Sequence, residues 1–130
     1  MTEIPEARPS PGSSADKATA TASPVERHVN AEQAAELLAS GKKIVVLDVR
    51  TPSEFAQGHL RGAVNVDYRG TAFVDELKKL DRSASYLVHC RSGRRSTAAF
   101  AQMLDLGFTS LYHMDGGMIA WQAAGQKVVK

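Results

Sequence analysis

The sequence has 130 residues, which is the length of about one domain. Hydrophobic residues make up 43% and charged residues 23%, so the composition excludes a fibrous or wholly disordered chain. Sixteen Lys and Arg against fourteen Asp and Glu leave a net charge of +2, which favours neither nucleic acid nor an anionic membrane as a partner. The single cysteine, Cys90, excludes an internal disulfide and a multi-cysteine zinc site.

Residues 1–24 differ from the rest of the chain. Seventeen of these positions are Ala, Ser, Thr, Pro or Gly, and they include four of the five prolines, which predicts a flexible tail. The tail has no apolar segment of the kind found in secretory signals, and the longest aliphatic run, Ile44 to Leu47, is far shorter than the roughly 20 residues of a membrane-spanning helix. We therefore expect a cytoplasmic protein with one domain at residues 25–130.

The first half of this domain alternates between helical and extended patterns. Asn30 and Gln33 form a capping-box pattern that predicts a helix ending near Gly41. The continuous apolar run from Ile44 to Leu47 is typical of a strand buried on both faces. The elements expected next are a helical turn at 53–57 after Pro52, an extended piece at 64–66 and a helix carrying Phe73, Leu77 and Leu80.

The second half repeats the alternation. Tyr86 to Val88 predicts another buried strand, and Ser96 is expected to cap a helix that Gly107 ends. The last expected elements are a strand at 111–113, a turn at Gly116 and Gly117, and a helix through Ile119 and Trp121. Strands and helices of this length predict a small α/β domain with a mostly parallel sheet and helices on both faces.

Cys90 stands where a buried strand runs into a loop and then a helix. Backbone N–H groups and the helix dipole favour an anion at such a place, and three arginines lie within the next five residues. These features favour the thiolate, so we predict a lowered pKa for Cys90 and a reactive sulfur at the mouth of the sheet. A lone cysteine at a strand end is also compatible with an inert buried thiol, but Gly93 and the arginine cluster favour reactivity.

Several motifs resemble those of the single-domain rhodaneses. They cover about residues 25 to 130 and follow one another in the same order as in that family. They are Leu47-Asp48-Val49-Arg50, Glu54-Phe55, Gly58-His59-Leu60, Gly62-Ala63, Asn65, Cys90-x-x-Gly93-x-Arg95-Ser96, Gly116-Gly117 and Ala120-Trp121. This resemblance implies a five-stranded parallel sheet between helices. It also implies a sulfurtransferase that takes sulfur from thiosulfate or a persulfide onto Cys90 and passes it to cyanide, a thiol or a protein acceptor. No metal or organic cofactor is required by this chemistry.

The chemistry and position of the loop residues indicate their roles in this reaction. The backbone from Arg91 to Ser96 is expected to hold the persulfide as an oxyanion hole holds charge. The residues of this loop are Arg91, Ser92, Gly93, Arg94, Arg95 and Ser96. We expect Arg91 and Arg94 to point outward and bind the sulfonate oxygens of thiosulfate.

Four residues are expected to support the loop rather than react: Asp48, Arg50, Glu54 and His89. For Arg95, an ion pair with Asp48 or Glu54 that fixes the loop is favoured over direct substrate contact. Asp48 is interpreted as a structural acceptor rather than a base, and Arg50 is expected to reach the pocket mouth.

The histidines give weaker signals. His89 adjoins the nucleophile and either tunes its ionisation or is simply hydrogen-bonded. His59 is interpreted as a structural hydrogen-bonding residue. His28 and His113 show no partner by spacing, so no metal site is predicted.

Two other functions compete with sulfur transfer. A cysteine phosphatase or arsenate reductase needs an arginine six residues after the cysteine, and that position is Ser96, so the loop is one residue too short. A sulfur-relay carrier or binding module, tethered through residues 1–24, is the second alternative. Rapid turnover of thiosulfate with cyanide would favour the free enzyme over the carrier.

Overall fold

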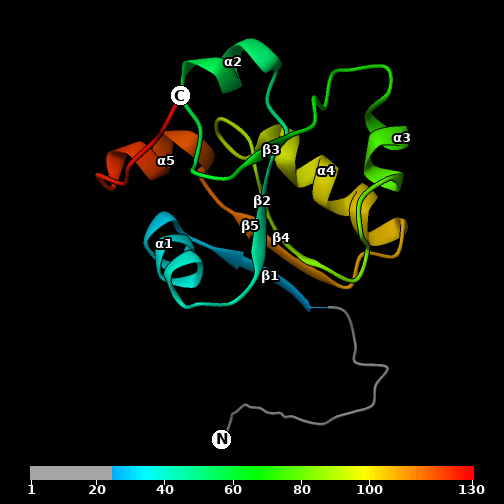
Figure 1. The fold of residues 1–130 in the computed structure, drawn as a ribbon, viewed down its shortest axis with the longest axis horizontal. Coiled ribbons are helices and arrows are strands. Elements are labelled where there is room, and N and C mark those ends of the chain that lie inside the picture. Colours follow the sequence, from blue (N-terminus) through cyan, green and yellow to red (C-terminus); the bar gives the residue numbers. More distant parts are fainter. Residues whose placement is uncertain (1–24) are drawn as a thin grey trace, which may run out of the picture.

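Five strands and five helices alternate along residues 25–130, the part of the chain that the computed structural model describes (Figure 1). The strands are β1 (Val25–Val29), β2 (Ile44–Asp48), β3 (Val64–Asn65), β4 (Ser85–His89) and β5 (Ser110–Met114). The helices are α1 (Ala31–Ala39), α2 (Pro52–Gln57), α3 (Phe73–Lys78), α4 (Arg94–Asp105) and α5 (Gly117–Ala123). The tail expected at residues 1–24 lies outside the described residues.

The five strands form one sheet in the order β1-β5-β4-β2-β3, and every pairing between them is parallel. The predicted α/β class is confirmed, and the sheet expected to be mostly parallel is parallel throughout. Because parallel strands end at the same edge, the carboxyl ends of β2, β4 and β5 lie together. Cys90 directly follows the central strand β4 and therefore lies at the middle of this edge.

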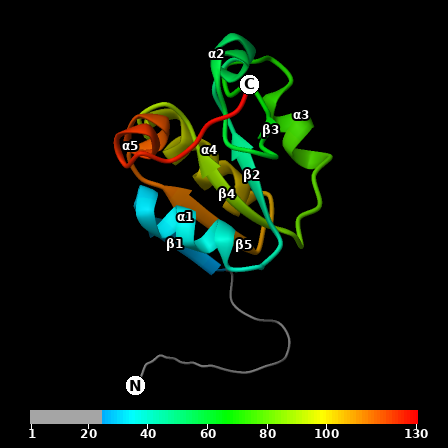
Figure 2. The ribbon, with the colours of Figure 1, turned by 60° about the vertical axis from the view of Figure 1, so that its left-hand side comes forward.

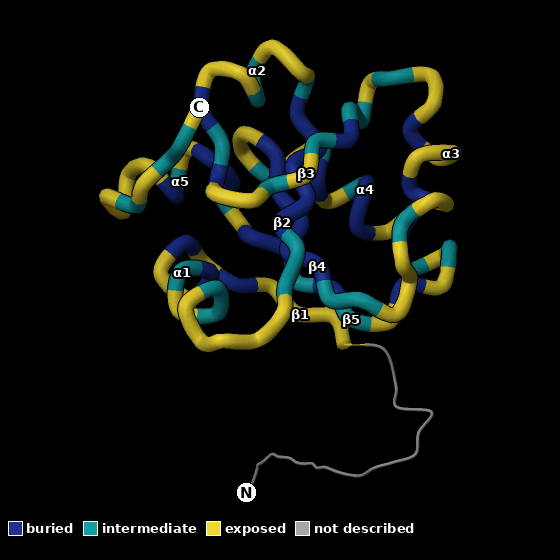
Figure 3. The backbone as a smooth tube through the Cα atoms, in the orientation of Figure 1, coloured by how far each residue is buried: buried dark blue, intermediate teal, exposed yellow. Residues whose placement is uncertain are grey.

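Helices cover both faces of the sheet. Figures 1 and 2 show α1 and α5 on one side and α3 and α4 on the other, with α2 beyond the carboxyl ends of the strands. Residues of β4 alternate between the two cores: Tyr86 and Val88 pack towards the α3 and α4 side, and Leu87 towards the α1 and α5 side. Burial on both faces explains the continuous apolar runs of β2 and β4, and Figure 3 shows buried residues concentrated along these strands.

Two helix starts follow from capping boxes. The Asn30 carboxamide accepts a hydrogen bond from the Gln33 backbone N–H at 2.7 Å, and the Gln33 side chain accepts one from the Asn30 N–H at 2.9 Å. Thr51 and Glu54 form the same arrangement at the start of α2, with Pro52 in the first helical position. The predicted helix after Asn30 is confirmed, and α2 begins one residue before the predicted helical turn.

Two parts of the prediction need correction. Helix α4 begins at Arg94, not after Ser96, because Gly93 takes the left-handed conformation (φ +108°) and ends the loop three residues sooner. Ser96 therefore lies in the first turn of α4 and does not cap it. Strand β1 was not expected from the residue pattern, since four of its five residues are exposed and only Val29 is buried.

Within residues 25–130, no helix is long and apolar enough to cross a membrane.

Candidate active site

The sulfur of Cys90 lies inside the loop that joins β4 to α4. The Gly93 N–H donates a hydrogen bond to Sγ at 3.1 Å, and the Ser96 hydroxyl lies 3.4 Å from the same atom. The left-handed conformation of Gly93 turns its N–H back towards the sulfur. The loop and the first turn of α4 thus surround Sγ with hydrogen-bond donors.

These donors determine the ionisation of the thiol. Burial is the largest effect and raises the pKa of Cys90, but hydrogen bonds from the Ser96 hydroxyl and from loop amides outweigh it. The amides belong to Ser92, Gly93 and Ser96. The pKa of Cys90 therefore lies below its ordinary value, in the predicted direction.

The sulfur is less exposed than expected for a reactive thiol at the carboxyl edge of the sheet. Cys90 is 1% exposed, whereas the next two residues, Arg91 and Ser92, are exposed. The sulfur that the loop surrounds therefore has almost no surface open to a substrate in this conformation.

The start of α5 holds the other side of this loop. The Met118 N–H donates to the Cys90 carbonyl at 2.9 Å, and the Ile119 N–H donates to the Arg91 carbonyl at 3.0 Å. Gly117 permits this approach, because a Cβ at that position would lie 2.5 Å from the Cys90 carbonyl oxygen. The Gly116–Gly117 turn expected from the sequence thus fixes the backbone of the nucleophile.

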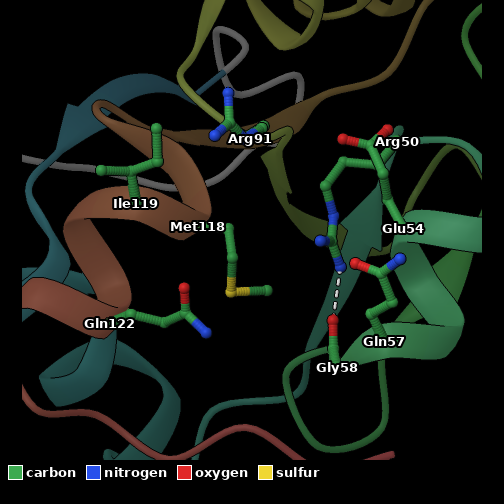
Figure 4. A pocket seen from close by; sticks show the side chains of 8 residues that line it. All are labelled: Arg50, Glu54, Gln57, Gly58, Arg91, Met118, Ile119 and Gln122. Carbon is green, nitrogen blue, oxygen red and sulfur yellow. Dashed lines mark hydrogen bonds between the residues drawn. The ribbon is translucent and has the colours of Figure 1, made fainter.

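An open cavity of ≈280 Å³ adjoins the loop (Figure 4). Its lining residues are Arg50, Glu54, Gln57, Gly58, Arg91, Met118, Ile119 and Gln122. Figure 4 shows that α2 and the residues around it form one wall and α5 the opposite wall, with Arg91 between them. The cavity therefore presents guanidinium groups to an anion beside the cysteine loop.

A buried ion pair supports the first wall. Arg50 donates to both carboxylate oxygens of Asp48, with Nη2 2.6 Å from Oδ2, and also to the Gly58 carbonyl at 2.7 Å. Asp48 is fully buried and Arg50 is 5% exposed. Asp48 thus acts as an acceptor for Arg50, and Arg50 reaches the cavity wall.

A second ion pair joins α4 to α2. The two terminal nitrogens of Arg95 contact the two carboxylate oxygens of Glu54 at 2.9 and 3.1 Å. Of the two partners considered from the sequence, Arg95 therefore contacts Glu54, while Asp48 is used by Arg50. Hydrogen bonding to Arg95 is the main reason that the pKa of Glu54 falls from 4.5 to about 2. Arg91 and Arg94 are exposed, as expected for outward-pointing side chains.

His89 and His59 have structural contacts. Burial lowers the pKa of His89, so its ring is neutral near pH 7; Nδ1 lies 3.0 Å from the Cys90 carbonyl oxygen. Its Nε2 is buried, has no hydrogen-bond partner among residues 25–130, and lies 3.8 Å from an oxygen of Asp48. His59 stacks on the Phe55 ring, with a centroid distance of 3.8 Å, and its Nδ1 contacts the Phe55 carbonyl at 2.9 Å.

The prediction that His28 and His113 lack partners is wrong. Both use Nδ1 to contact the same oxygen of Asp115, at 2.9 and 2.8 Å. The parallel pairing of β1 with β5 sets His28 beside His113, and β1 was the strand that the pattern did not reveal. One ligand atom from each of the three residues lies within 4.8 Å of the others, but both Nδ1 atoms already contact the same Asp115 oxygen. The absence of a metal site stays a prediction.

Comparison with known proteins agrees with this geometry. The model of the rhodanese-like domain family matches residues 30–124. The thiosulfate sulfurtransferase GlpE of Pseudomonas entomophila is 36% identical over 97 residues, covering 75% of this chain and 85% of that protein. The chloroplastic thiosulfate sulfurtransferase 16 of Arabidopsis thaliana is 38% identical over 107 residues, covering 75% of this chain and 88% of that protein.

A solved structure gives the same result. The crystal structure of a rhodanese-related protein from Thermoplasma volcanium superposes with a TM-score of 0.70 and 31% identity, covering 79% of this chain and 97% of that one. A parallel α/β sheet with a cysteine loop at its carboxyl edge thus defines the class. The chain belongs to the rhodanese-like domain family.

Proposed function

We propose that the protein is a rhodanese-type thiosulfate sulfurtransferase that carries sulfur as a persulfide on Cys90. The observation that supports this most is the ring of donors around Sγ, with Gly93 N–H at 3.1 Å and Ser96 Oγ at 3.4 Å. Such donors stabilise a thiolate before the reaction and the charged terminal sulfur after it. Relatives named thiosulfate sulfurtransferases, at 36% and 38% identity, support the same reaction.

The first half-reaction is a displacement at sulfur. The Cys90 thiolate attacks the sulfane sulfur of thiosulfate, a new S–S bond forms, and sulfite leaves with the electrons of the broken S–S bond. The sulfonate oxygens of the donor bind the exposed guanidinium groups of Arg91 and Arg94. Asp48, Arg50, Glu54 and Arg95 hold the surrounding walls, and His89 packs beneath the loop. No metal or organic cofactor takes part.

The second half-reaction regenerates the enzyme. A thiophilic acceptor, cyanide or a cellular thiol, attacks the outer sulfur of the persulfide, and Cys90 leaves as the thiolate. Ping-pong kinetics with parallel double-reciprocal lines are expected. The unpaired thiol suits a reducing compartment such as the cytoplasm.

Intact-mass analysis tests the proposal directly. The full chain is treated with thiosulfate, freed of excess reagent and weighed, beside the Cys90→Ser variant. The native chain is expected to gain the mass of one sulfur atom, and the variant none. Because Cys90 is the only cysteine, sulfur found on the variant, or none on the native chain, would refute the persulfide.

The 1% exposure of Cys90 favours a second candidate, a sulfur carrier that releases its sulfur only to a partner protein. The two functions differ in rate. Fast turnover of thiosulfate with cyanide indicates the enzyme, whereas slow turnover with a long-lived protein persulfide indicates the carrier.

A further inference from the structure

Four side chains form a continuous chain of contacts that leads away from the nucleophile. Ser96 Oγ lies 3.4 Å from Cys90 Sγ and 2.7 Å from His113 Nε2, and His113 Nδ1 lies 2.8 Å from Asp115 Oδ1. Ser96 is fully buried and His113 is 2% exposed. The reaction described above uses neither His113 nor Asp115, so their alignment with the thiol needs another explanation.

The protonation state of the His113 ring determines which atom accepts the hydroxyl hydrogen of Ser96. A carboxylate only accepts hydrogen bonds, so His113 Nδ1 donates to Asp115. When the ring is neutral, Nε2 is then an acceptor and takes the single hydroxyl hydrogen of Ser96. When the ring is protonated, Nε2 donates to Ser96 Oγ, and that hydrogen is free to bond to Sγ.

We propose that His113 is a positioning residue that accepts the Cys90 proton through Ser96. The thiol proton passes to Ser96 Oγ while the hydroxyl proton of Ser96 passes to His113 Nε2, which leaves a thiolate and an imidazolium with no change in net charge. The S–H bond and the O–H bond break, and a new O–H bond and an N–H bond form, with no redox change. This inference rests on the proposed function, because it explains how Cys90 becomes the nucleophile.

The surroundings of His113 are suited to a positive ring. Asp115 supplies the negative charge; hydrogen bonds from His28 and His113 outweigh the effect of its partial burial, so its pKa is lowered and it stays ionised. His28 from β1 lies with its ring centroid 5.2 Å away, and His89 from β4 is neutral near pH 7 because burial lowers its pKa. From α4, Phe100 presents an uncharged ring at 5.8 Å.

The test measures the reaction of Cys90 with iodoacetamide as a function of pH in the full chain. The His113→Phe variant removes the acceptor and is expected to react roughly tenfold more slowly near pH 6, since a shift of one pKa unit changes the thiolate fraction tenfold. The His113→Gln variant keeps a hydrogen bond to Ser96 but cannot accept a proton, so it is expected to react as slowly as His113→Phe, and recovery of the native profile would overturn the relay. Tyr112→Phe, on the same strand and opposite face, is the control.

A second measurement does not depend on the stability of these variants. In ¹⁵N-histidine NMR at one fixed pH, the Nε2 resonance of His113 is expected to move towards that of a neutral ring when Cys90 is replaced by Ala, because the ring loses the group whose proton it accepts. An unchanged alkylation profile in folded His113→Phe, or an unchanged His113 resonance, would overturn the relay. Thiosulfate loading of the native chain is measured in parallel, so that failure of the relay is separated from failure of the sulfurtransferase.

Discussion

Arg95 and Glu54 form a two-point ion pair that joins the first turn of α4 to α2. The pair is only partly accessible, with side chains 15% and 26% exposed. Because α4 starts immediately after the cysteine loop, this pair fixes the loop relative to the cavity wall. The Arg95–Glu54 pair is therefore expected to contribute both to the free energy of unfolding and to the rate of sulfur transfer.

Replacing Arg95 by Ala is expected to lower the free energy of unfolding by about 1–2 kcal/mol at pH 7, the scale of a well-aligned and partly buried pair. Sulfur transfer is expected to slow as well, because the loop loses an anchor. Urea denaturation and steady-state rates measure the two effects. The exposed Arg94 supplies the stability control, and Arg94→Ala should change unfolding by less than about 0.5 kcal/mol. If Arg95→Ala and Arg94→Ala lower the free energy of unfolding equally, the structural role of Arg95 is contradicted.

The same pair predicts a pH dependence of stability. The pKa of Glu54 is lowered from 4.5 to about 2, mainly by its hydrogen bond to Arg95, so the folded state favours the ionised carboxylate. The stabilisation is complete above pH 4.5 and disappears as the pH falls towards 2. The difference in unfolding free energy between native chain and Glu54→Gln should therefore shrink over this range. A difference that stays constant down to pH 2 would exclude Glu54 as its source.

Gly117 is expected to be the glycine least able to accept a side chain. A Cβ there would lie 2.5 Å from the Cys90 carbonyl oxygen and 2.6 Å from that of Arg91. Gly117→Ala should therefore displace the loop, reduce sulfur loading and lower stability by about 1–3 kcal/mol more than the control. The matched control is Gly125→Ala, because Gly125 also has a positive φ but a Cβ there would meet no atom of the described residues within 4 Å. Similar thermal unfolding of the two variants would argue against the steric explanation.

Arg50→Ala should leave the fully buried Asp48 carboxylate without its partner. Such a loss costs about 3–5 kcal/mol, so the variant is expected to be among the least stable single substitutions in the domain. Urea denaturation would measure it, with the exposed Arg61→Ala as control. If the urea concentration at the midpoint of unfolding equals the native value within error, another group compensates the Asp48 charge.

Arg91→Ala tests anion binding, because Arg91 lines the cavity and is exposed. The KM for thiosulfate is expected to rise roughly tenfold, equivalent to about 1.4 kcal/mol, while thermal unfolding stays unchanged. Added salt should raise the native KM more than that of the variant. If KM is unaffected and only kcat falls, Arg91 acts on the reacting sulfur rather than on binding.

The sequence predicted what depends on local pattern. The apolar runs of β2 and β4 and the Asn30 capping box are encoded by neighbouring residues, and the loop of Cys90 carries its arginines and glycine within six positions. Strand β1 could not be recognised because its sequence is largely polar, and its pairing with β5 depends on a partner more than eighty residues away.

The contacts of His113 were missed for the same reason. Its partners Ser96 and His28 come from α4 and β1, and only the assembled sheet sets them beside the ring. The depth of Cys90 likewise depends on how tightly Gly93 turns, which the residue types do not specify.

In Figure 1 the residues after α5 run back towards α2, whose residues Glu54 and Gln57 line the opposite side of the cavity. The Trp121 indole donates to the Lys127 carbonyl, and His59 and Val129 exchange two backbone hydrogen bonds of 2.8 Å next to Gly58. This strap links α5 to the wall that carries Gly58. Lengthening or shortening residues 124–128 is therefore expected to change the spacing of the two walls, and with it the size of the sulfur donor that the cavity admits.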